Sequence, residues 1–316
     1  MVQYLYNTTL ERTGDTEATM KKLLFIYNVH AGKGLLKSRL AAVLDCFVRA
    51  GWDVSVHPTQ GAGDATAVAA ERAGAFDRIV CSGGDGTLHE VVTGLMTQET
   101  RPAVGYIPAG TTNDFAKNLS LPRGMEAMAR AAAAGCPRPV DIGRFNDRFF
   151  IYVAAFGAFT EIAYSTPQKA KNLLGYNAYI LEVVKNLASI KPYHIKVEWE
   201  DQVLEGDYLY GMVSNTTSVG RFRNFPPGNP DLSDGLLEVT LISPIRDVKD
   251  MEEFSRALLM TDPSILNSMM TTFSTAKVKI TAAAELLWTL DGEAGGAHQT
   301  VEIEAIPHAY TIIHGK

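Results

Sequence analysis

The sequence has few cysteines and no long hydrophobic run. Its three cysteines, Cys46, Cys81 and Cys136, lie far apart and form no Cys-x-x-Cys pair. We therefore expect buried free thiols in a reducing compartment and no disulfide framework. No stretch approaches the roughly 18 uncharged apolar residues of a membrane-spanning helix, and the N-terminus lacks a basic region followed by an apolar core. These absences predict a cytoplasmic protein that touches membrane only peripherally.

Basic residues are also too few for a nucleic-acid interface. The chain of 316 residues has 29 Lys and Arg against 35 Asp and Glu, a formal net charge of -6. Proteins hold phosphate backbones with basic stripes, and no long stripe occurs, so no nucleic-acid partner is expected. The hydrophobic content of 46% suits one large or two medium cores, and we expect two domains. Residues 1–19 are polar and aperiodic, which predicts a disordered extension.

Two common phosphate-binding motifs and one zinc motif are missing as well. Gly32-Lys33 is followed by Gly34 and lacks the upstream glycine of a Gly-x4-Gly-Lys-Ser/Thr loop, and no Gly-x-Gly-x-x-Gly occurs. His89-Glu90 is similar to the start of a zinc-protease helix, but Thr93 stands where the second histidine is required. Zinc is therefore not expected.

The order of expected elements changes near the middle of the chain. Up to about residue 138, strand-like runs alternate with helical periodicity, which predicts a parallel sheet covered by helices on both faces. Beyond residue 140, strand pairs with turn signals predict antiparallel sheets, as in a β-sandwich. The first half is expected to hold strands 23–27, 53–57, 77–81 and 103–107 and helices 35–50, 64–73, 87–97, 114–119 and 124–135. The second half is expected to hold strands 139–145, 148–156, 193–200, 203–214, 236–243, 276–282, 286–290, 299–305 and 309–314 and helices 169–190 and 248–273.

The expected helix 169–190 has an apolar stripe with lysines at its edges. Such a helix either packs against the rest of the protein or presents a lipid-facing surface, and both interpretations stay open.

Residues 83–87, Gly-Gly-Asp-Gly-Thr, form the most informative motif that is present. They join an expected strand to an expected helix. The backbone amides of Gly83, Gly84 and Gly86, together with the helix N-terminus, suit a polyphosphate. Asp85 would be repelled by a triphosphate unless a cation lay between them, which indicates Mg²⁺ and phosphoryl transfer. An isolated match could equally be an ordinary turn.

Residues 108–116 form a second loop of the same kind. They also follow an expected strand and combine a glycine turn, two hydroxyls, a carboxamide and a carboxylate. Ligands of alternating α/β sheets bind at the carboxyl ends of the strands, so the two loops should face one pocket. Asp85 and Asp114 are the expected Mg²⁺ ligands, although Asp114 could instead cap a helix.

These motifs resemble those of the diacylglycerol kinase-like lipid kinases. That family shares its catalytic-domain pattern with sphingosine kinases and, more distantly, with NAD kinases and phosphofructokinases. The resemblance runs from about Leu23 to the C-terminus. It rests on six segments in family order, which are 28–34, Thr59 with 63–65, 83–87, 108–116, 234–236 and 291–293.

The family resemblance implies a two-domain fold around a cleft. It implies a nucleotide-binding three-layer α/β domain at 20–138 with a parallel sheet, and a β-rich, sandwich-like lipid-substrate domain at 139–316. The active site would lie in the cleft between them, and the final strand could return to the first domain.

The resemblance also implies ATP as phosphoryl donor and Mg²⁺ as the cation. The nucleotide-binding residues it implies are Asn28, Gly32, Thr59, Gly83, Gly84, Asp85, Gly86, Thr87, Leu88, His89 and Thr112. Val29 replaces a proline of the family, and His89 stands where the family usually has Asn. Thr87 could be a simple helix cap and Thr59 an ordinary turn residue. A second, structural Mg²⁺ is implied at Asp231, Asp234 and Leu236, where a plain turn is the alternative.

Asp291-Gly292-Glu293 matches the place where the family carries its proton-accepting carboxylate. Glu293 is the first choice for the base, with Asp291 orienting it or sharing the role, and Asp85 completes the expected catalytic set. The alternative is a tight Asp-Gly hairpin turn. The small residues 294–297 that follow predict a longer connection than such a turn needs.

The expected activity is ATP- and Mg²⁺-dependent phosphorylation of a lipid hydroxyl, with diacylglycerol as the preferred acceptor and phosphatidate as the product. One alternative is a kinase of the same architecture with a soluble acceptor such as NAD. Another is a nucleotide- or lipid-binding sensor without turnover. The expected partners are a lipid substrate and a membrane surface, and a homodimer is compatible with the sequence.

Overall fold

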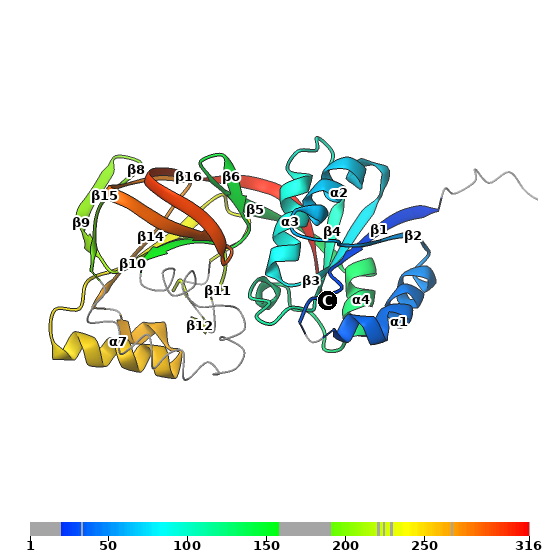
Figure 1. Cartoon of the computed structure of the whole chain (residues 1–316), viewed down its shortest axis with the longest axis horizontal. Coiled ribbons are helices and arrows are strands. Elements are labelled where there is room, and N and C mark those ends of the chain that lie inside the picture. The colour runs from blue at the N-terminus through cyan, green and yellow to red at the C-terminus, as the bar shows by residue number, and fades with distance from the viewer. Residues whose placement is uncertain are drawn as a thin grey trace, which may run out of the picture.

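The computed structural model of the chain has two lobes that lie side by side (Figure 1). It describes residues 20–32, 34–157, 191–219, 222–223, 225–227, 230–266 and 268–315. The expected extension at 1–19 and the expected helix at 169–190 lie outside the described residues.

The first lobe is built on a parallel sheet with strand order β4-β3-β1-β2. Its strands are β1 (Lys21–Tyr27), β2 (Trp52–Pro58), β3 (Arg78–Gly83) and β4 (Ala103–Pro108). Its helices are α1 (Leu35–Arg49), α2 (Asp64–Arg72), η1 (Ala73–Ala75), α3 (Asp85–Leu95), η2 (Phe115–Asn118) and α4 (Met125–Ala134).

Alternating side chains of β1 explain why both faces of this sheet are covered. Leu23 and Phe25 lie in one hydrophobic core with residues of α1 and α4. Leu24 and Ile26 lie in another core with residues of α2 and α3. Successive strand residues point to opposite faces, so one apolar run supplies both layers. The expected three-layer α/β lobe is confirmed.

The second lobe is dominated by antiparallel strands, as expected. Its elements are β5 (Cys136–Phe145), β6 (Arg148–Phe150), β7 (Val153–Gly157), β8 (Tyr193–Trp199), β9 (Gln202–Tyr208), β10 (Tyr210–Ser214), β11 (Ser218–Val219), β12 (Phe222–Arg223), β13 (Leu237–Ile242), α7 (Val248–Met260), η4 (Pro263–Leu266), β14 (Met270–Thr275), β15 (Lys277–Leu290) and β16 (Glu293–His314). Phe145, Phe156 and Trp288 are fully buried at the centre of this lobe. The Trp288 ring lies 5.0 Å from the Phe145 ring and 4.9 Å from the Phe156 ring, measured between centroids.

Strand β16, red in Figure 1, connects the two lobes. Its first part pairs with β15, its later part pairs with β5, and near its end Ile312 pairs in parallel with Val104 of β4. One sheet therefore runs through both lobes in the order β14-β13-β10-β7-β15-β16-β4-β3-β1-β2.

The helix expected at 248–273 is too long. Helix α7 ends at Met260 because Thr261 adopts a left-handed backbone with φ 52°. Pro263 follows two residues later, and proline cannot continue a helix. Residues 270–275 form β14, which pairs with β13.

Several strand boundaries also differ from expectation. The ranges 276–282 and 286–290 form the single strand β15 with a register shift between Thr281 and Leu286. The ranges 299–305 and 309–314 likewise belong to β16, which shifts register between Ile306 and Tyr310. Conversely, 148–156 divides into β6 and β7, and 203–214 divides into β9 and β10.

Candidate active site

A cleft of about 460 Å³ lies at the carboxyl ends of the parallel strands. It is lined by Asn28, His30, Ala31, Gly32, Thr59, Gln60, Gly61, Ala62, Gly84, Gly86, Thr87, Glu90, Gly110, Thr111 and Glu293. The structure thus brings the two glycine loops to one cleft, together with one residue of the second lobe, Glu293.

Six of the residues expected to bind nucleotide line this cleft. They are Asn28, Gly32, Thr59, Gly84, Gly86 and Thr87. The Gly83 carbonyl instead accepts hydrogen bonds from the backbone N–H groups of Ala109 and Gly110, at 2.7 and 3.2 Å, and ties the two loops together. Leu88 is buried in the core of the first lobe.

Thr112 and His89 also lie away from the cleft lining. Thr112 is exposed, and its neighbour Thr111 lines the cleft in its place. His89 faces Asp291 of the other lobe. The nucleotide-binding roles of all these residues stay predictions.

Close packing between the loops explains the glycine at position 110. A Cβ atom at Gly110 would lie 2.5 Å from the Gly84 Cα atom, closer than any real contact. Asn113 holds the second loop in this position, because Asn113 Oδ1 accepts from the Gly110 N–H at 2.9 Å and its Nδ2 donates to the Gly110 carbonyl at 2.9 Å. Glycine is therefore required for the loops to meet.

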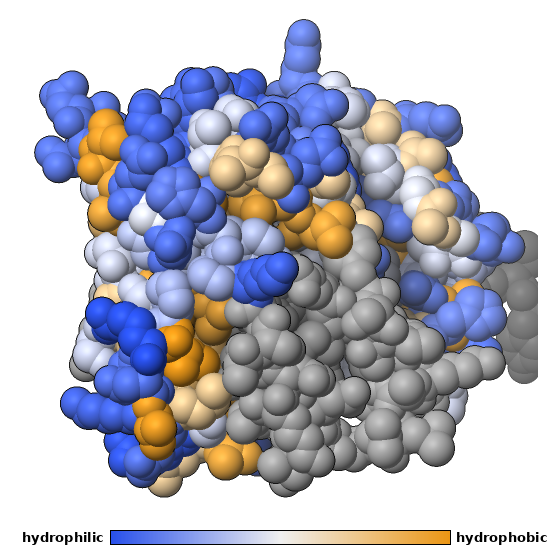
Figure 2. Space-filling view, turned by 60° about the vertical axis from the view of Figure 1, so that its left-hand side comes forward, coloured by the Kyte–Doolittle hydropathy of each residue, from blue (hydrophilic) through white to orange (hydrophobic). Residues whose placement is uncertain are grey.

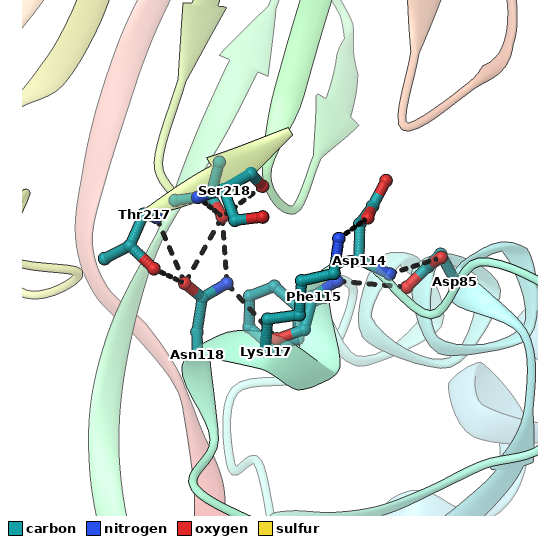
Figure 3. A network of polar contacts seen from close by, with 8 residues as sticks. Asp85, Asp114, Phe115, Lys117, Asn118, Thr217 and Ser218 are labelled. Atoms are coloured by element: carbon teal, nitrogen blue, oxygen red, sulfur yellow. Dashed lines mark hydrogen bonds and ion pairs between the residues drawn. The ribbon is translucent and has the colours of Figure 1, made fainter. Parts of the chain in front are cut away.

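Asp85 begins helix α3 and faces the start of η2 (Figure 3). Its carboxylate accepts hydrogen bonds from the backbone N–H groups of Asp114, at 2.9 Å, and Phe115, at 3.2 Å. Burial raises the pKa of Asp85 to about 6, these two N–H groups oppose the rise, and the nearby charges of Asp114 and Asp291 add to it. The Asp85 carboxylate is therefore both partly buried and crowded by like charge.

Asp114 is 4% exposed, and its Oδ1 accepts a hydrogen bond from Lys117 Nζ at 2.5 Å. The short helix η2, which follows Asp114 and contains Lys117, is tied to the second lobe through Asn118. Asn118 Nδ2 donates to Thr216 Oγ1 at 2.9 Å, and its Oδ1 accepts from the Thr217 N–H at 3.1 Å (Figure 3).

Asp85 and Asp114 carry the kind of ligand that fits Mg²⁺, although neither lines the cleft, and their metal role stays a prediction. Mg²⁺ prefers hard oxygen ligands and is commonly held by one or two carboxylates together with substrate phosphates. A cation beside Asp85 would favour its ionised form, which burial and the neighbouring carboxylates disfavour. Across the described part of the chain, no group of three or more His, Cys, Asp or Glu could hold a metal ion.

The turn between β15 and β16 brings two carboxylates to the first lobe. Asp291 is buried, and its Oδ1 accepts from the N–H groups of Tyr152 and Val153 at 3.0 Å each. Its Oδ2 accepts from the Ile151 N–H at 2.7 Å and lies 2.7 Å from His89 Nδ1. With four hydrogen-bond partners, Asp291 is suited to fixing the turn.

Glu293, two residues later, is exposed and lines the cleft. Its Oε1 lies 3.6 Å from the position that a Cβ atom at Gly86 would occupy. Glu293 can therefore receive a proton in the cleft, whereas the Asp291 oxygens are already occupied.

The expectation of a long connection after Asp291 is wrong. The turn has two residues, Asp291 with φ 51° and Gly292 with φ 85°, and Glu293 already pairs with Leu290. Paired positive φ angles are typical of type I′ hairpins, which favour Asp-Gly. Gly295 is the extra residue: Trp288 pairs with Gly296 and Thr289 pairs with Ala294, so a bulge accommodates it.

Sequence reasoning missed Glu90 as a cleft residue. Its carboxylate accepts hydrogen bonds from the N–H groups of Gly63, at 2.9 Å, and Ala65, at 3.2 Å, so it joins α3 to the start of α2. Glu90 lies four residues after Gly86 on α3, a spacing that places the two residues on one helix face. Seven other residues of the cleft were not among the predicted site residues, namely His30, Ala31, Gln60, Gly61, Ala62, Gly110 and Thr111.

The expected structural Mg²⁺ residues form a hydrogen-bonded turn. Asp234 Oδ1 accepts from the Leu236 N–H at 2.9 Å, and Asp231 Oδ1 accepts from the Ser233 N–H at 3.1 Å. A residue that was not predicted, the buried Asp141, accepts from the Gly235 N–H at 2.6 Å. These hydrogen bonds are those expected if residues 231–236 form a plain turn, and their role in binding a structural Mg²⁺ stays a prediction.

Known protein families match both lobes of the chain. The model of the diacylglycerol kinase catalytic domain matches residues 22–145, and that of the YegS C-terminal NAD kinase beta sandwich-like domain matches residues 157–314. The diacylglycerol kinase of Bacillus subtilis is 38% identical over 283 residues, 88% of this chain and 91% of that protein. The chain belongs to the diacylglycerol kinase family. This membership makes it a lipid kinase-like enzyme and implies the use of ATP.

Other members of the diacylglycerol kinase family agree in sequence and fold. The diacylglycerol kinase of Staphylococcus saprophyticus is 36% identical over 223 residues, 70% of this chain and 73% of that protein. A solved structure from Bacillus anthracis str. Sterne matches with a TM-score of 0.79 at 25% identity, covering 97% of this chain and 98% of that one. The expected family and fold class are therefore confirmed.

Proposed function

We propose that the protein transfers the γ-phosphoryl group of ATP to the free hydroxyl of diacylglycerol, giving phosphatidate and ADP. The observation that carries the proposal is the position of Glu293, which reaches from the second lobe into the cleft lined by both glycine loops. A phosphoryl donor in the loops and an acceptor from the β-rich lobe would meet at this carboxylate. The names of the relatives favour diacylglycerol over a soluble acceptor such as NAD.

Each group at the site has a role in this reaction. The backbone amides of Gly84 and Gly86 would orient the polyphosphate, as helix N-termini and glycine turns do for anions. Asp85 and Asp114 would hold Mg²⁺, which when bound offsets the negative charge of the phosphates.

The Glu293 carboxylate would accept the proton of the acceptor hydroxyl. At the same time, the hydroxyl oxygen of the lipid would bond to the γ-phosphorus. The bond from the γ-phosphorus to the bridging oxygen breaks, and ADP leaves with that electron pair. Asp291 would keep the hairpin that carries Glu293 in place.

Contact with a membrane surface is part of this proposal, because the acceptor is a membrane lipid. Among the described residues, no helix is long and apolar enough to cross a bilayer. Helix α7 carries exposed apolar side chains at both ends, with Val248 85%, Leu259 58% and Met260 65% exposed. Figure 2 shows hydrophobic residues scattered among hydrophilic ones in the lower left of this face, the side where Figure 1 places α7. These side chains favour peripheral contact.

The test is transfer of labelled γ-phosphate with Mg²⁺ to diacylglycerol, a sphingoid base, a total lipid extract and NAD. We expect label in diacylglycerol, and Glu293→Gln should reduce it by roughly 10²- to 10⁴-fold, the usual contribution of a general base. Glu285→Gln, an exposed carboxylate of the same hairpin, is the matched control and should retain activity. Label only in NAD, or none despite ATP binding, would contradict the proposal.

A further inference from the structure

His89 links the two lobes through Asp291, which lies two residues before the cleft residue Glu293. It lies on α3 of the first lobe, and its Nδ1 lies 2.7 Å from Asp291 Oδ2 in the second. The His89 side chain is 18% exposed and that of Asp291 is 0% exposed. Asp291 also accepts three backbone hydrogen bonds from residues 151–153, so one carboxylate joins α3 to two segments of the β-rich lobe.

Charged groups from several elements face this pair. Arg148, at the start of β6, donates to the carbonyls of Ala294 and Gly295 at 3.0 and 3.1 Å and anchors the same hairpin. Glu90 lies next to His89 on α3, and at the start of that helix the pKa of Asp85 is raised in part by the charge of Asp291.

These groups act on His89 in opposite directions. Burial lowers the pKa of His89, but the hydrogen bond and the charge of Asp291 outweigh it. Arg148 lowers the pKa further and Glu90 raises it, and the net effect is a pKa above the ordinary value.

We propose that His89 is a positioning residue, which holds Glu293 at the mouth of the cleft by bonding to Asp291. Glu293 is separated from Asp291 by Gly292 alone, in a turn with two left-handed residues, so any displacement of Asp291 moves Glu293. This inference rests on the proposed function, because it gives His89 a role in the transfer for which Glu293 is the base.

The histidine makes the link dependent on protonation. A charged imidazolium donates to Asp291 and offsets its charge, whereas a neutral imidazole offers at most the hydrogen bond. Because the pKa of His89 is raised, the charged link is present below that value and is lost as the pH rises through it. Phosphoryl transfer should therefore decline on the alkaline side as the hairpin loosens.

Substitutions separate the hydrogen bond from the charge. His89→Asn keeps an amide donor near the Nδ1 position and cannot titrate, while His89→Ala removes both. The kcat and KM for transfer to diacylglycerol would be measured from about pH 6 to about pH 9. We expect His89→Ala to lower kcat on the order of 100-fold, as a misplaced group does, with little change in KM for ATP. His89→Asn should recover most of kcat and lose the alkaline decline.

His194→Asn is the matched control. His194 is an exposed histidine of β8 whose pKa is raised by Asp207 and Glu205, and it does not line the cleft. Its substitution should leave the pH profile of the wild type unchanged. An alkaline decline that persists in His89→Asn, or an undiminished kcat in His89→Ala, would overturn the proposal.

Two measurements do not depend on the acceptor. NMR titration of the imidazole should give a raised midpoint for His89, and Asp291→Asn should lower it. The amides of Ile151, Tyr152 and Val153 should exchange faster with solvent in His89→Ala than in His89→Asn. If the wild type labels no lipid, the proposed function fails, but these two measurements still test whether His89 holds Asp291 in place. An unshifted midpoint of His89 or equal exchange rates in the two variants would reject that role.

Discussion

The ionised carboxylate of Asp85 destabilises the folded chain when no cation neutralises it. Burial, with the charges of Asp114 and Asp291, raises its pKa from 3.8 to about 6 despite two backbone N–H donors. Because the folded-state pKa exceeds the unfolded one, the protonated carboxyl favours the folded state. This stabilisation is complete below the unfolded value and is lost as the pH rises through the folded value. The shift of about two units corresponds to on the order of 3 kcal/mol.

Asp85→Asn removes this titration and should change the pH dependence of stability. Asparagine must turn its NH₂ group toward one of two backbone donors, the N–H of Asp114 or of Phe115, which costs about 1–3 kcal/mol at every pH. The informative quantity is therefore the difference between two free energies of unfolding, that of the variant minus that of the wild type. Urea denaturation without Mg²⁺ would measure this difference at a series of pH values. This difference should move in favour of the variant as the pH rises, and roughly half of the total change should fall between about pH 5 and about pH 7.5.

Two additions complete the experiment. Asp201→Asn, in the exposed β8–β9 turn, controls for the loss of one negative charge. Mg²⁺ with ATP should stabilise the wild type more than Asp85→Asn, because only the wild type has the carboxylate expected to hold the ion. A stability difference that is independent of pH, or that favours the variant more at low pH, would refute the assignment of a raised pKa to Asp85.

Two further substitutions test single contacts, one between the two glycine loops and one in the turn that contains Gly235. Gly110→Ala should weaken ATP binding by at least about tenfold in calorimetric titration, because its Cβ would force Gly84 away; Gly74→Ala, whose Cβ would meet nothing closer than 3.7 Å, should bind normally. Asp141→Ala should lower the free energy of unfolding by roughly 3–5 kcal/mol in urea, since the N–H groups of Gly235 and His308 lose a charged acceptor; a loss below about 1 kcal/mol would contradict this role.

The parallel half of the fold could be predicted from local pattern alone. Leu23 to Ile26 in β1 fill two cores on opposite faces, and a run buried on both sides is apolar throughout. The glycine loops could be located for a similar reason, since they follow such runs directly. Their convergence on one cleft follows from parallel strands, whose carboxyl ends meet at one edge of the sheet.

The bulge at Gly295 could not be predicted, because it depends on pairing across a hairpin. A row of small residues after Asp291-Gly292 is compatible with a long loop or with a tight turn followed by an irregular strand. Only the register of β15 against β16 decides between them. The end of α7 is a comparable case, because threonine tolerates a helix and Thr261 adopts its left-handed backbone in the packed structure.

The partner of His89 was beyond sequence reasoning for another reason. His89 and Asp291 are separated by 202 positions, and only the assembled lobes bring them together. The signal that did exist was chemical: a histidine on the helix after the glycine loop offers a hydrogen-bond donor that can also titrate.

The path of β16 explains how a residue of one lobe can serve loops of the other. Glu293 begins this strand, and near its end Ile312 pairs with Val104 of β4. Strand β4 leads directly into the loop that contains Gly110 and Asp114. The expected base therefore begins a strand whose far end pairs with β4, the strand that leads to one of the expected metal ligands, and the His89–Asp291 contact joins the same hairpin to α3. The sheet sets the coarse distance between base and phosphate loops, and His89 would set the fine position of the hairpin that carries the base.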